Sequence, residues 1–258
     1  MFRTLHLSGM ADNFAELAVK AASAHLTYET YLAEVVQCEC AVREQRRIAR
    51  LLRQSGLPAD KTFHTLHLDR FPLNVQQQVE HLRSGGFTAD AINVVAAGKP
   101  GVGKSHLLAA LGHELILQGK AVLWTSTATL VQQLLAAKRD LRLPQALAKL
   151  DRVACLILDD IGYVQHERDE MEVLFTLLAE RYERRSVAIS TNLVFSEWER
   201  IFKDPMTTLA AIDRVVHHSV ILDLMGMESY RAQEATAQLE SSVSRRQTTT
   251  SARHKAAA

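Results

Sequence analysis

The chain has 258 residues, of which 47% are hydrophobic and 23% charged, as in an ordinary soluble globular protein with one sizeable α/β domain and a small appendage. Thirty basic against twenty-nine acidic residues give a net charge of +1, so any nucleic-acid site must come from local clustering of charge. The three cysteines are too few for a disulfide framework, and neither a signal-peptide pattern nor an apolar run of membrane-spanning length is present. These features favour a cytoplasmic protein with reduced thiols and no membrane contact.

Residues 1–57 contain no β-rich run and are predicted to form a small all-helical domain that binds DNA or a partner. Two helical stretches, ADNFAELAVKAASAHL and TYETYLAEVVQCECAVREQRRIARLLRQSG, are expected to start near Asp12 and Thr27, whose side chains can cap a helix. Gly56 marks the expected end of the second helix. A connector over 58–86 then leads to the main domain.

Residues 87–240 alternate between apolar runs and helical stretches. The apolar runs are AINVVAA, AVLWTST, VACLILDD, SVAISTN and SVILDL. This alternation predicts an α/β domain with a five-stranded parallel sheet covered on both faces. The tail over 241–258 is rich in Ser, Thr and Ala, with four lysines and arginines and no acidic residue, so it is predicted to be disordered.

A phosphate-binding pattern, G-x-x-x-x-G-K-S, lies between an apolar run and a helical stretch with leucines on one face. Glycines let successive N–H groups curl around a phosphate, and the following helix N-terminus adds its positive dipole end. The predicted ATP-binding residues are Gly98, Lys99, Pro100, Gly101, Val102, Gly103, Lys104 and Ser105. Lys104 would reach the β- and γ-phosphates, and the Ser105 hydroxyl would ligate Mg²⁺. The alternative is a chance glycine-rich turn.

Polar residues follow two of the later apolar runs. Asp159 and Asp160 end VACLILDD, where Asp159 is predicted to support Mg²⁺ and Asp160 to polarise an attacking water as general base. Asn192 ends SVAISTN and is expected between the γ-phosphate and that water. Surface acids capping a turn, and a turn-forming asparagine, are the alternatives. The strand AVLWTST between the phosphate loop and the acidic strand is typical of P-loop ATPases rather than of simple nucleotide kinases.

Five arginines recur at helical spacing within AVREQRRIARLLRQ. They are Arg43, Arg46, Arg47, Arg50 and Arg53. At about 100° per residue they occupy roughly a third of the helix circumference, and Glu44 falls outside that arc. Charge runs are commonly solvated faces, but such faces mix both signs. An aligned set of arginines without acids therefore favours contact with the DNA backbone over a merely solvated face.

Several stretches of the chain resemble the IstB-like transposition helper ATPases, which are related to DnaC-type helicase loaders within the AAA+ class. They are GKPGVGKSHLLAALGHEL, LILDDIGYV, ERYERRSVAISTNLVFSEWERIF, DRVVHHSVILDL and MESYR, and KTFHTLHLDRFP is similar to the family's connector. The resemblance implies an AAA+ ATPase that assembles as an ATP-dependent homo-oligomer on double-stranded target DNA. It further implies a cognate transposase as partner and the promotion of DNA transposition.

The resemblance also implies residue roles. Asn192 corresponds to the family's first sensor, Arg214 to the arginine finger donated to a neighbouring subunit's ATP, and Arg231 to a second phosphate sensor. Too few residues follow for a C-terminal lid. Asp160 stands where many members have Glu, which places the carboxylate about one C–C bond further from water and implies slow hydrolysis. A replicative helicase loader and a non-hydrolysing, nucleotide-gated DNA scaffold are the alternative functions.

Overall fold

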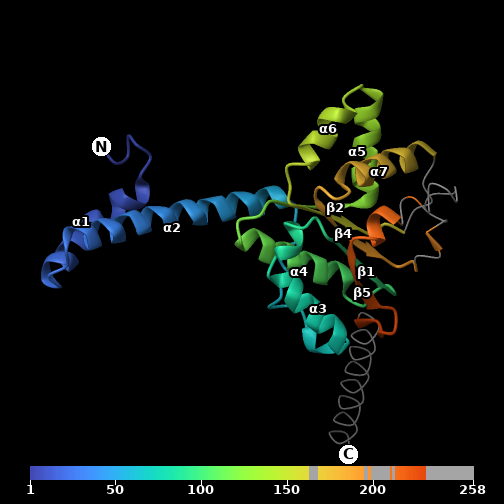
Figure 1. Cartoon of the computed structure of the whole chain (residues 1–258), viewed down its shortest axis with the longest axis horizontal. Helices are drawn as coiled ribbons and strands as arrows, with labels where there is room; N and C mark the ends of the chain where they lie inside the picture. Colours follow the sequence, from blue (N-terminus) through green and yellow to red (C-terminus); the bar gives the residue numbers. More distant parts are fainter. Residues whose placement is uncertain (163–167, 195–196, 199–209, 211–212, 231–258) are drawn as a thin grey trace, which may run out of the picture.

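Five parallel strands form a single sheet at the centre of the molecule (Figure 1). The computed structural model describes residues 1–162, 168–194, 197–198, 210 and 213–230. The strands are β1 (Asn93–Gly98), β2 (Val122–Ser126), β3 (Cys155–Asp159), β4 (Ser186–Thr191) and β5 (Ser219–Leu224). Their order across the sheet is β2-β3-β4-β1-β5. Each strand coincides with one predicted apolar run, so the predicted five-stranded parallel sheet is confirmed.

Helices cover both faces of this sheet, and the strands β1 and β4 are therefore buried along their whole length. The helices are α3 (Leu73–Arg83), α4 (Lys104–Leu117), α5 (Thr127–Arg139), α6 (Leu143–Leu150) and α7 (Arg168–Arg181), with single 3-10 turns at η1 (Leu68–Arg70) and η2 (Gly86–Thr88). Alternate strand residues face opposite ways, so Val95 packs among residues of α5, α6 and α7, whereas Val94 packs among those of α3 and α4. The carboxyl ends of all five strands lie at one edge, where ligands of such sheets bind.

The N-terminal region is a two-helix hairpin that projects from the body of the molecule (Figure 1). It consists of α1 (Ser8–Ser23) and α2 (Tyr28–Ser55). Thr27 caps α2 by accepting a hydrogen bond from the backbone N–H of Thr30 at 3.3 Å, and Gly56 ends it with a left-handed φ of 68°, as predicted. Asp12 does not cap α1, because that helix already begins at Ser8.

A buried carboxylate joins the two helices of the hairpin. Glu39 on α2 accepts hydrogen bonds from the backbone N–H groups of Gly9 at 2.7 Å and Met10 at 3.2 Å, at the start of α1. Its other oxygen accepts a hydrogen bond from Arg43 Nε at 2.8 Å, which holds the pKa of Glu39 below its usual value. A Cβ at Gly9 would lie 2.8 Å from the carbonyl oxygen of Cys38, so the helices approach this closely only with glycine there.

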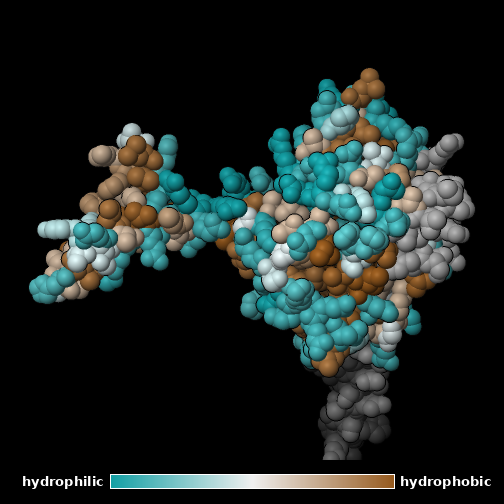
Figure 2. All heavy atoms as spheres, in the orientation of Figure 1, coloured by the Kyte–Doolittle hydropathy of each residue, from teal (hydrophilic) through white to brown (hydrophobic). Residues whose placement is uncertain are grey.

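The C-terminal half of α2 anchors the hairpin to the body. Ile48, Leu51 and Leu52 pack against the core on the α3 and α4 side of the sheet, and Arg47 Nη2 donates a hydrogen bond to the carbonyl of Gly119 at 2.7 Å. The far half keeps apolar side chains in solvent, among them Leu32 and Val36. Figure 2 shows apolar atoms gathered on this projecting part of the molecule. Within the described ranges, no helix has the length and apolarity needed to cross a membrane.

The connector between hairpin and sheet lies along α4. Two histidines two turns apart on that helix hold it: His113 Nε2 lies 2.9 Å from the carbonyl oxygen of Pro58, and His106 Nε2 lies 3.2 Å from that of Thr62. Later in the connector, α3 buries Val75, Val79 and Leu82 in the core. The connector is therefore held in place beside the helix that follows the predicted phosphate loop.

Candidate functional site

The loop between β1 and α4 carries the predicted phosphate-binding pattern. β1 ends at Gly98 and α4 begins at Lys104. Between them, Gly101 and Gly103 adopt left-handed φ values of 83° and 100°, which glycine reaches without steric cost. Gly103 is the residue at the N-cap of α4. The loop therefore leads directly into a helix N-terminus, whose N–H groups and dipole favour an anion.

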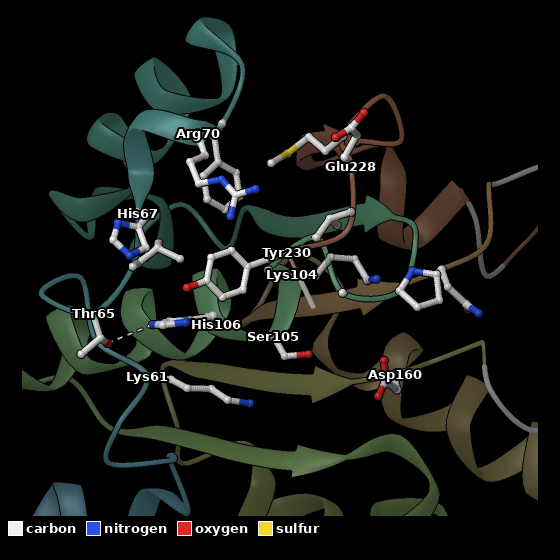
Figure 3. Close-up of a pocket in the computed structure, with 18 residues that line it drawn as sticks. Lys61, Thr65, His67, Arg70, Lys104, Ser105, His106, Asp160, Glu228 and Tyr230 are labelled. Atoms are coloured by element: carbon white, nitrogen blue, oxygen red, sulfur yellow. Dashed lines mark hydrogen bonds between the residues drawn. The ribbon is translucent and has the colours of Figure 1, made fainter. Parts of the chain in front are cut away.

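The two side chains that follow this loop face the same cavity (Figure 3). Lys104 is buried, and its Nζ donates hydrogen bonds to the carbonyl oxygens of Gly98 at 2.7 Å and Lys99 at 3.0 Å. Ser105 is half-buried beside it and presents its hydroxyl to the cavity. A cation and a hydroxyl at the start of a helix are suited to phosphate oxygens and to a hard metal ion.

The acidic pair lies at the end of β3. β4 separates β3 from β1, so the acidic strand is next to the immediate neighbour of the phosphate-loop strand. Asp160 is exposed and lines the same cavity as Ser105. Asp159 is half-buried outside the cavity lining, and its Oδ1 accepts a hydrogen bond from Ser190 Oγ at 2.6 Å. The two carboxylates therefore have different surroundings, one open to the cavity and one held by the neighbouring strand.

Asn192 also borders the cavity, directly after β4. A Cβ added to Gly162 would lie 2.6 Å from Asn192 Oδ1, so the turn after the acidic strand packs closely against this amide. The structure thus brings Asn192 and Asp160, predicted from separate apolar runs, to one cavity.

The cavity has a volume of about 360 Å³, within the range of small-molecule sites. The predicted residues that line it are Pro100, Gly101, Val102, Gly103, Lys104, Ser105, Asp160 and Asn192. Gly98 and Lys99 lie outside the lining but contribute the carbonyls that hold Lys104.

One wall of the cavity comes from residues that sequence reasoning gave no role. Tyr230 lies between two connector residues, with the Arg70 guanidinium carbon 4.7 Å from its ring centroid and the His67 ring 6.2 Å away. Its backbone N–H donates to the carbonyl of Gly101 in the phosphate loop at 3.0 Å. Lys61 lines the same side. The signal available in the sequence was the density of basic and aromatic residues in KTFHTLHLDRFP.

Arg214 lies outside the cavity lining of its own chain. Its guanidinium carbon stacks 4.8 Å from the centroid of the Phe175 ring, and its Nη1 donates to the carbonyl of Ala210 at 3.1 Å. The Arg214 guanidinium is therefore held against α7 and the backbone at Ala210, and not in the cavity lining. Arg231, the predicted second phosphate sensor, lies outside the described residues, as does the tail over 241–258.

The five predicted DNA-contacting arginines are exposed on α2, but they are not equivalent. Arg43 pairs with Glu39, Arg53 donates to the carbonyl of Ala49 on the same helix at 3.3 Å, and Arg47 bonds Gly119. Glu44 was predicted to lie outside the arginine arc, yet its carboxylate reaches Arg47 Nη1 at 3.6 Å because both side chains are long. In the described part of the chain, the side chains of Arg46 and Arg50 form no hydrogen bond or ion pair.

Comparison with known proteins identifies the family. The family model described as IstB-like ATP binding protein matches residues 1–238. The chain belongs to this family. An insertion sequence ATP-binding protein of Sinorhizobium fredii (strain NBRC 101917 / NGR234), y4iQ/y4nD/y4sD, is 46% identical over 206 residues, which are 80% of this chain and 69% of that protein. The IS21 ATP-binding protein of Pseudomonas aeruginosa is 36% identical over 229 residues, covering 89% of this chain and 85% of the relative.

Solved structures agree on the fold. The DnaC helicase loader superposes with a TM-score of 0.53 at 17% identity, covering 64% of this chain and 97% of that one. AMPPCP-bound DnaA from Aquifex aeolicus gives a TM-score of 0.57 at 15% identity, covering 72% and 57%. The chain therefore has the P-loop AAA+ fold, and its family is one of ATP-binding proteins. The predicted ligand ATP is confirmed at the level of the family.

Proposed function

We propose that the protein is an ATP-hydrolysing, DNA-binding helper of a transposase, which assembles on target DNA and promotes transposition. The observation that carries the proposal is the convergence of Lys104, Ser105, Asp160 and Asn192 on one cavity, in a chain of the insertion-sequence ATP-binding family. ATP binding alone requires only the phosphate loop. Hydrolysis also requires groups that act on the attacking water, and an exposed carboxylate and an amide beyond the loop are suited to that task.

Hydrolysis would use this chain's side chains in distinct roles. Lys104 would exchange the loop carbonyls for phosphate oxygens. Asp160 would accept a proton from the attacking water, and Asn192 would orient that water. The Ser105 hydroxyl and the Asp159 carboxylate are hard oxygen donors of the kind that Mg²⁺ prefers, so these residues fit that ion. When bound, Mg²⁺ would neutralise charge on the phosphates.

Arg214 would complete the site of a neighbouring subunit. Its stacking on Phe175 outside the cavity of its own chain fits a residue that acts in trans. A guanidinium is suited to the charge that develops on a transferred phosphoryl group. ATP would thereby stabilise a homo-oligomer, and its hydrolysis would reset the assembly.

Duplex DNA would meet the arginine-bearing face of α2. The exposed side chains of Arg46 and Arg50 are the strongest candidates for phosphate contacts, since Arg43 and Arg47 already have partners within the protein. Phosphate contacts position a protein on DNA without reading its sequence, which suits a helper that accepts many targets.

The test combines imaging on duplex DNA with a strand-transfer assay that includes a transposase of an insertion sequence of this family. With ATP, the wild type should form assemblies on DNA and stimulate strand transfer, whereas with ADP it should do neither. Asp160→Asn should assemble with ATP but release no phosphate over many turnovers, so its assemblies should persist.

Equal stimulation with ATP and ADP would contradict the proposed role of ATP. Unchanged phosphate release by Asp160→Asn would remove the proposed base. Loading of a replicative helicase without stimulation of the transposase would favour the helicase-loader alternative, and assembly without any turnover in the wild type would favour the non-hydrolysing scaffold.

A further inference from the structure

A fully buried hydroxyl connects the carboxylate of Asp159 to the backbone of Asp160. Ser190, near the end of β4, has no solvent exposure. Its Oγ lies 2.6 Å from Asp159 Oδ1 and 2.8 Å from the backbone nitrogen of Asp160. Its own carbonyl oxygen accepts a hydrogen bond from the backbone N–H of Ile161 at 3.0 Å. One residue of the neighbouring strand therefore contacts three consecutive residues of the turn that carries the acids.

The direction of these hydrogen bonds follows from the groups involved. A backbone N–H can only donate, so Asp160 donates to Ser190 Oγ. An ionised carboxylate can only accept, so the single hydroxyl hydrogen of Ser190 must point at Asp159. Both contacts are satisfied at once by a hydroxyl and by no aliphatic side chain.

The consequence for Asp159 is that its carboxylate is held in one orientation. Oδ1 is bonded to Ser190, while Oδ2 has no hydrogen-bond partner within the described ranges of the chain. A carboxylate that is fixed through one oxygen presents the other to a cation or to water without the entropic cost of ordering it.

The consequence for Asp160 concerns the backbone. Asp160 has a left-handed φ of 58°, which is uncommon for a residue with a Cβ. The bond from its N–H to Ser190 Oγ holds the turn in this conformation, and the conformation directs the carboxylate to the cavity. Loss of the hydroxyl would leave a half-buried N–H without its acceptor and free the turn to relax.

We propose that Ser190 is a positioning residue that fixes the Asp159 carboxylate for Mg²⁺ and the Asp160 carboxylate for the attacking water. The proposal rests on the proposed ATP hydrolysis for its second half only, since the orientation of Asp159 also governs Mg²⁺-dependent nucleotide binding. Ser190 itself lies outside the lining of the cavity.

The test compares Ser190→Ala with Ser190→Thr, which keeps the hydroxyl, and with Ser186→Ala as matched control. Ser186 is a fully buried serine on the same strand and the same sheet face, but its hydroxyl contacts the carbonyl of Phe87 rather than the acidic pair. For each variant, the affinity for a fluorescent ATP analogue is measured in EDTA and across a Mg²⁺ titration. Turnover is measured at saturating ATP.

In Ser190→Ala, affinity in EDTA should equal that of the wild type, because the phosphate loop is untouched. The Mg²⁺ concentration for half-saturation should rise, and kcat should fall, each by about tenfold, as expected when a hydrogen bond to a charged group is lost. Ser190→Thr should recover both quantities to within about threefold, and Ser186→Ala should change neither.

Unchanged Mg²⁺ half-saturation and kcat in Ser190→Ala would overturn the proposal. Weakened nucleotide binding of Ser190→Ala in EDTA would also overturn the proposal, because it would show that Ser190 only maintains the fold. A folded Ser190→Thr that behaves as Ser190→Ala would overturn it as well. If the wild type has no turnover, the proposed hydrolysis fails, but the Mg²⁺ titration still decides whether Ser190 orients Asp159.

Discussion

Two adjacent regions of the phosphate loop place lysines in opposite environments. Lys104 is buried and hydrogen-bonded to two carbonyls at the cavity, whereas Lys99 is exposed and outside the cavity lining. The first has a fixed geometry toward a bound phosphate, while the second contributes only a screened charge nearby. This contrast provides a matched pair of variants.

Lys104→Ala should abolish tight ATP binding, because it removes the cation that the loop holds at the cavity. Lys99→Ala removes the same charge from the same loop, yet it should weaken binding by less than about fivefold, as for other exposed charges. Calorimetric titration of both variants with ATP measures the difference. Equal losses in the two variants would show that net charge, rather than the position of Lys104, determines affinity.

Residues of the cavity differ in how far the sequence could predict them. Lys104, Asp160 and Asn192 follow apolar runs, so their position at the carboxyl edge of the sheet follows from the pattern. Tyr230 and Arg70 are far apart in the chain, and Arg70 belongs only to the short 3-10 turn η1, which carries no periodic apolar pattern. Only the folding of the connector along α4 brings them together, and no local pattern encodes that contact.

At the scale of elements, the strands were predicted and several charged helix residues were not. Full burial on both faces produces continuous apolar runs, which are visible in a single sequence. Arginine is usually found at the surface. Arg181 on α7 is nevertheless buried, and its side chain donates hydrogen bonds to the carbonyls of Leu150, Val153 and Ser186. Burial lowers its pKa to about 10. Its three acceptors come from the end of α6, the turn after it and the start of β4, which only the tertiary structure brings together.

Some arginines of helix α2 bond within the protein, whereas others are available for the proposed DNA contact. Replacing Arg46 and Arg50 together by Ala should flatten the slope of log K against log salt for duplex DNA by about 1 to 2 units, since each phosphate contact contributes about 0.9. Affinity should fall equally for unrelated DNA sequences, and ATP affinity should not change. Arg47 is left intact because its bond to Gly119 anchors the helix. Binding is measured by fluorescence anisotropy over a salt series.

The matched control replaces by Ala two exposed basic residues, Lys149 in the last turn of α6 and Arg152 in the turn before β3. It removes the same total charge from elsewhere on the surface, so its salt slope should remain that of the wild type. A slope that flattens equally in both double variants would point to a general electrostatic effect. An unchanged slope and affinity in the α2 variant would show that these arginines form a solvated face and do not contact DNA.

At the scale of the whole molecule, the position of Arg214 outside its own cavity predicts complementation between subunits. Lys104→Ala and Arg214→Ala should each lack ATPase activity, the latter because an arginine finger contributes about 10³-fold or more in rate. A mixture should recover activity, since a site formed by the phosphate loop of one variant and the arginine of the other is complete. Phosphate release is measured across mixing ratios.

A mixture of Lys104→Ala with Asp160→Asn is the control, because both defects affect the same side of the site and no combination of subunits repairs it. Light scattering verifies that the mixed subunits assemble. If they assemble and the first mixture remains as inactive as the control at every ratio, Arg214 does not act in trans.

The projection of α2 from the body makes it a lever arm. Its 28 residues, at about 1.5 Å per residue, give a length of about 42 Å. The arm is fixed only along its C-terminal half, where Arg47 and three apolar side chains meet the body beside β2 and α4. The part of α2 from Tyr28 to the anchor at Arg47 is about 28 Å long. A tilt of about 10° at Arg47 would move the far end of this part by about 5 Å, between one and two base-pair steps along a duplex. Adjustments too small to repack the ATPase core would therefore change which stretch of DNA or of a partner the hairpin reaches.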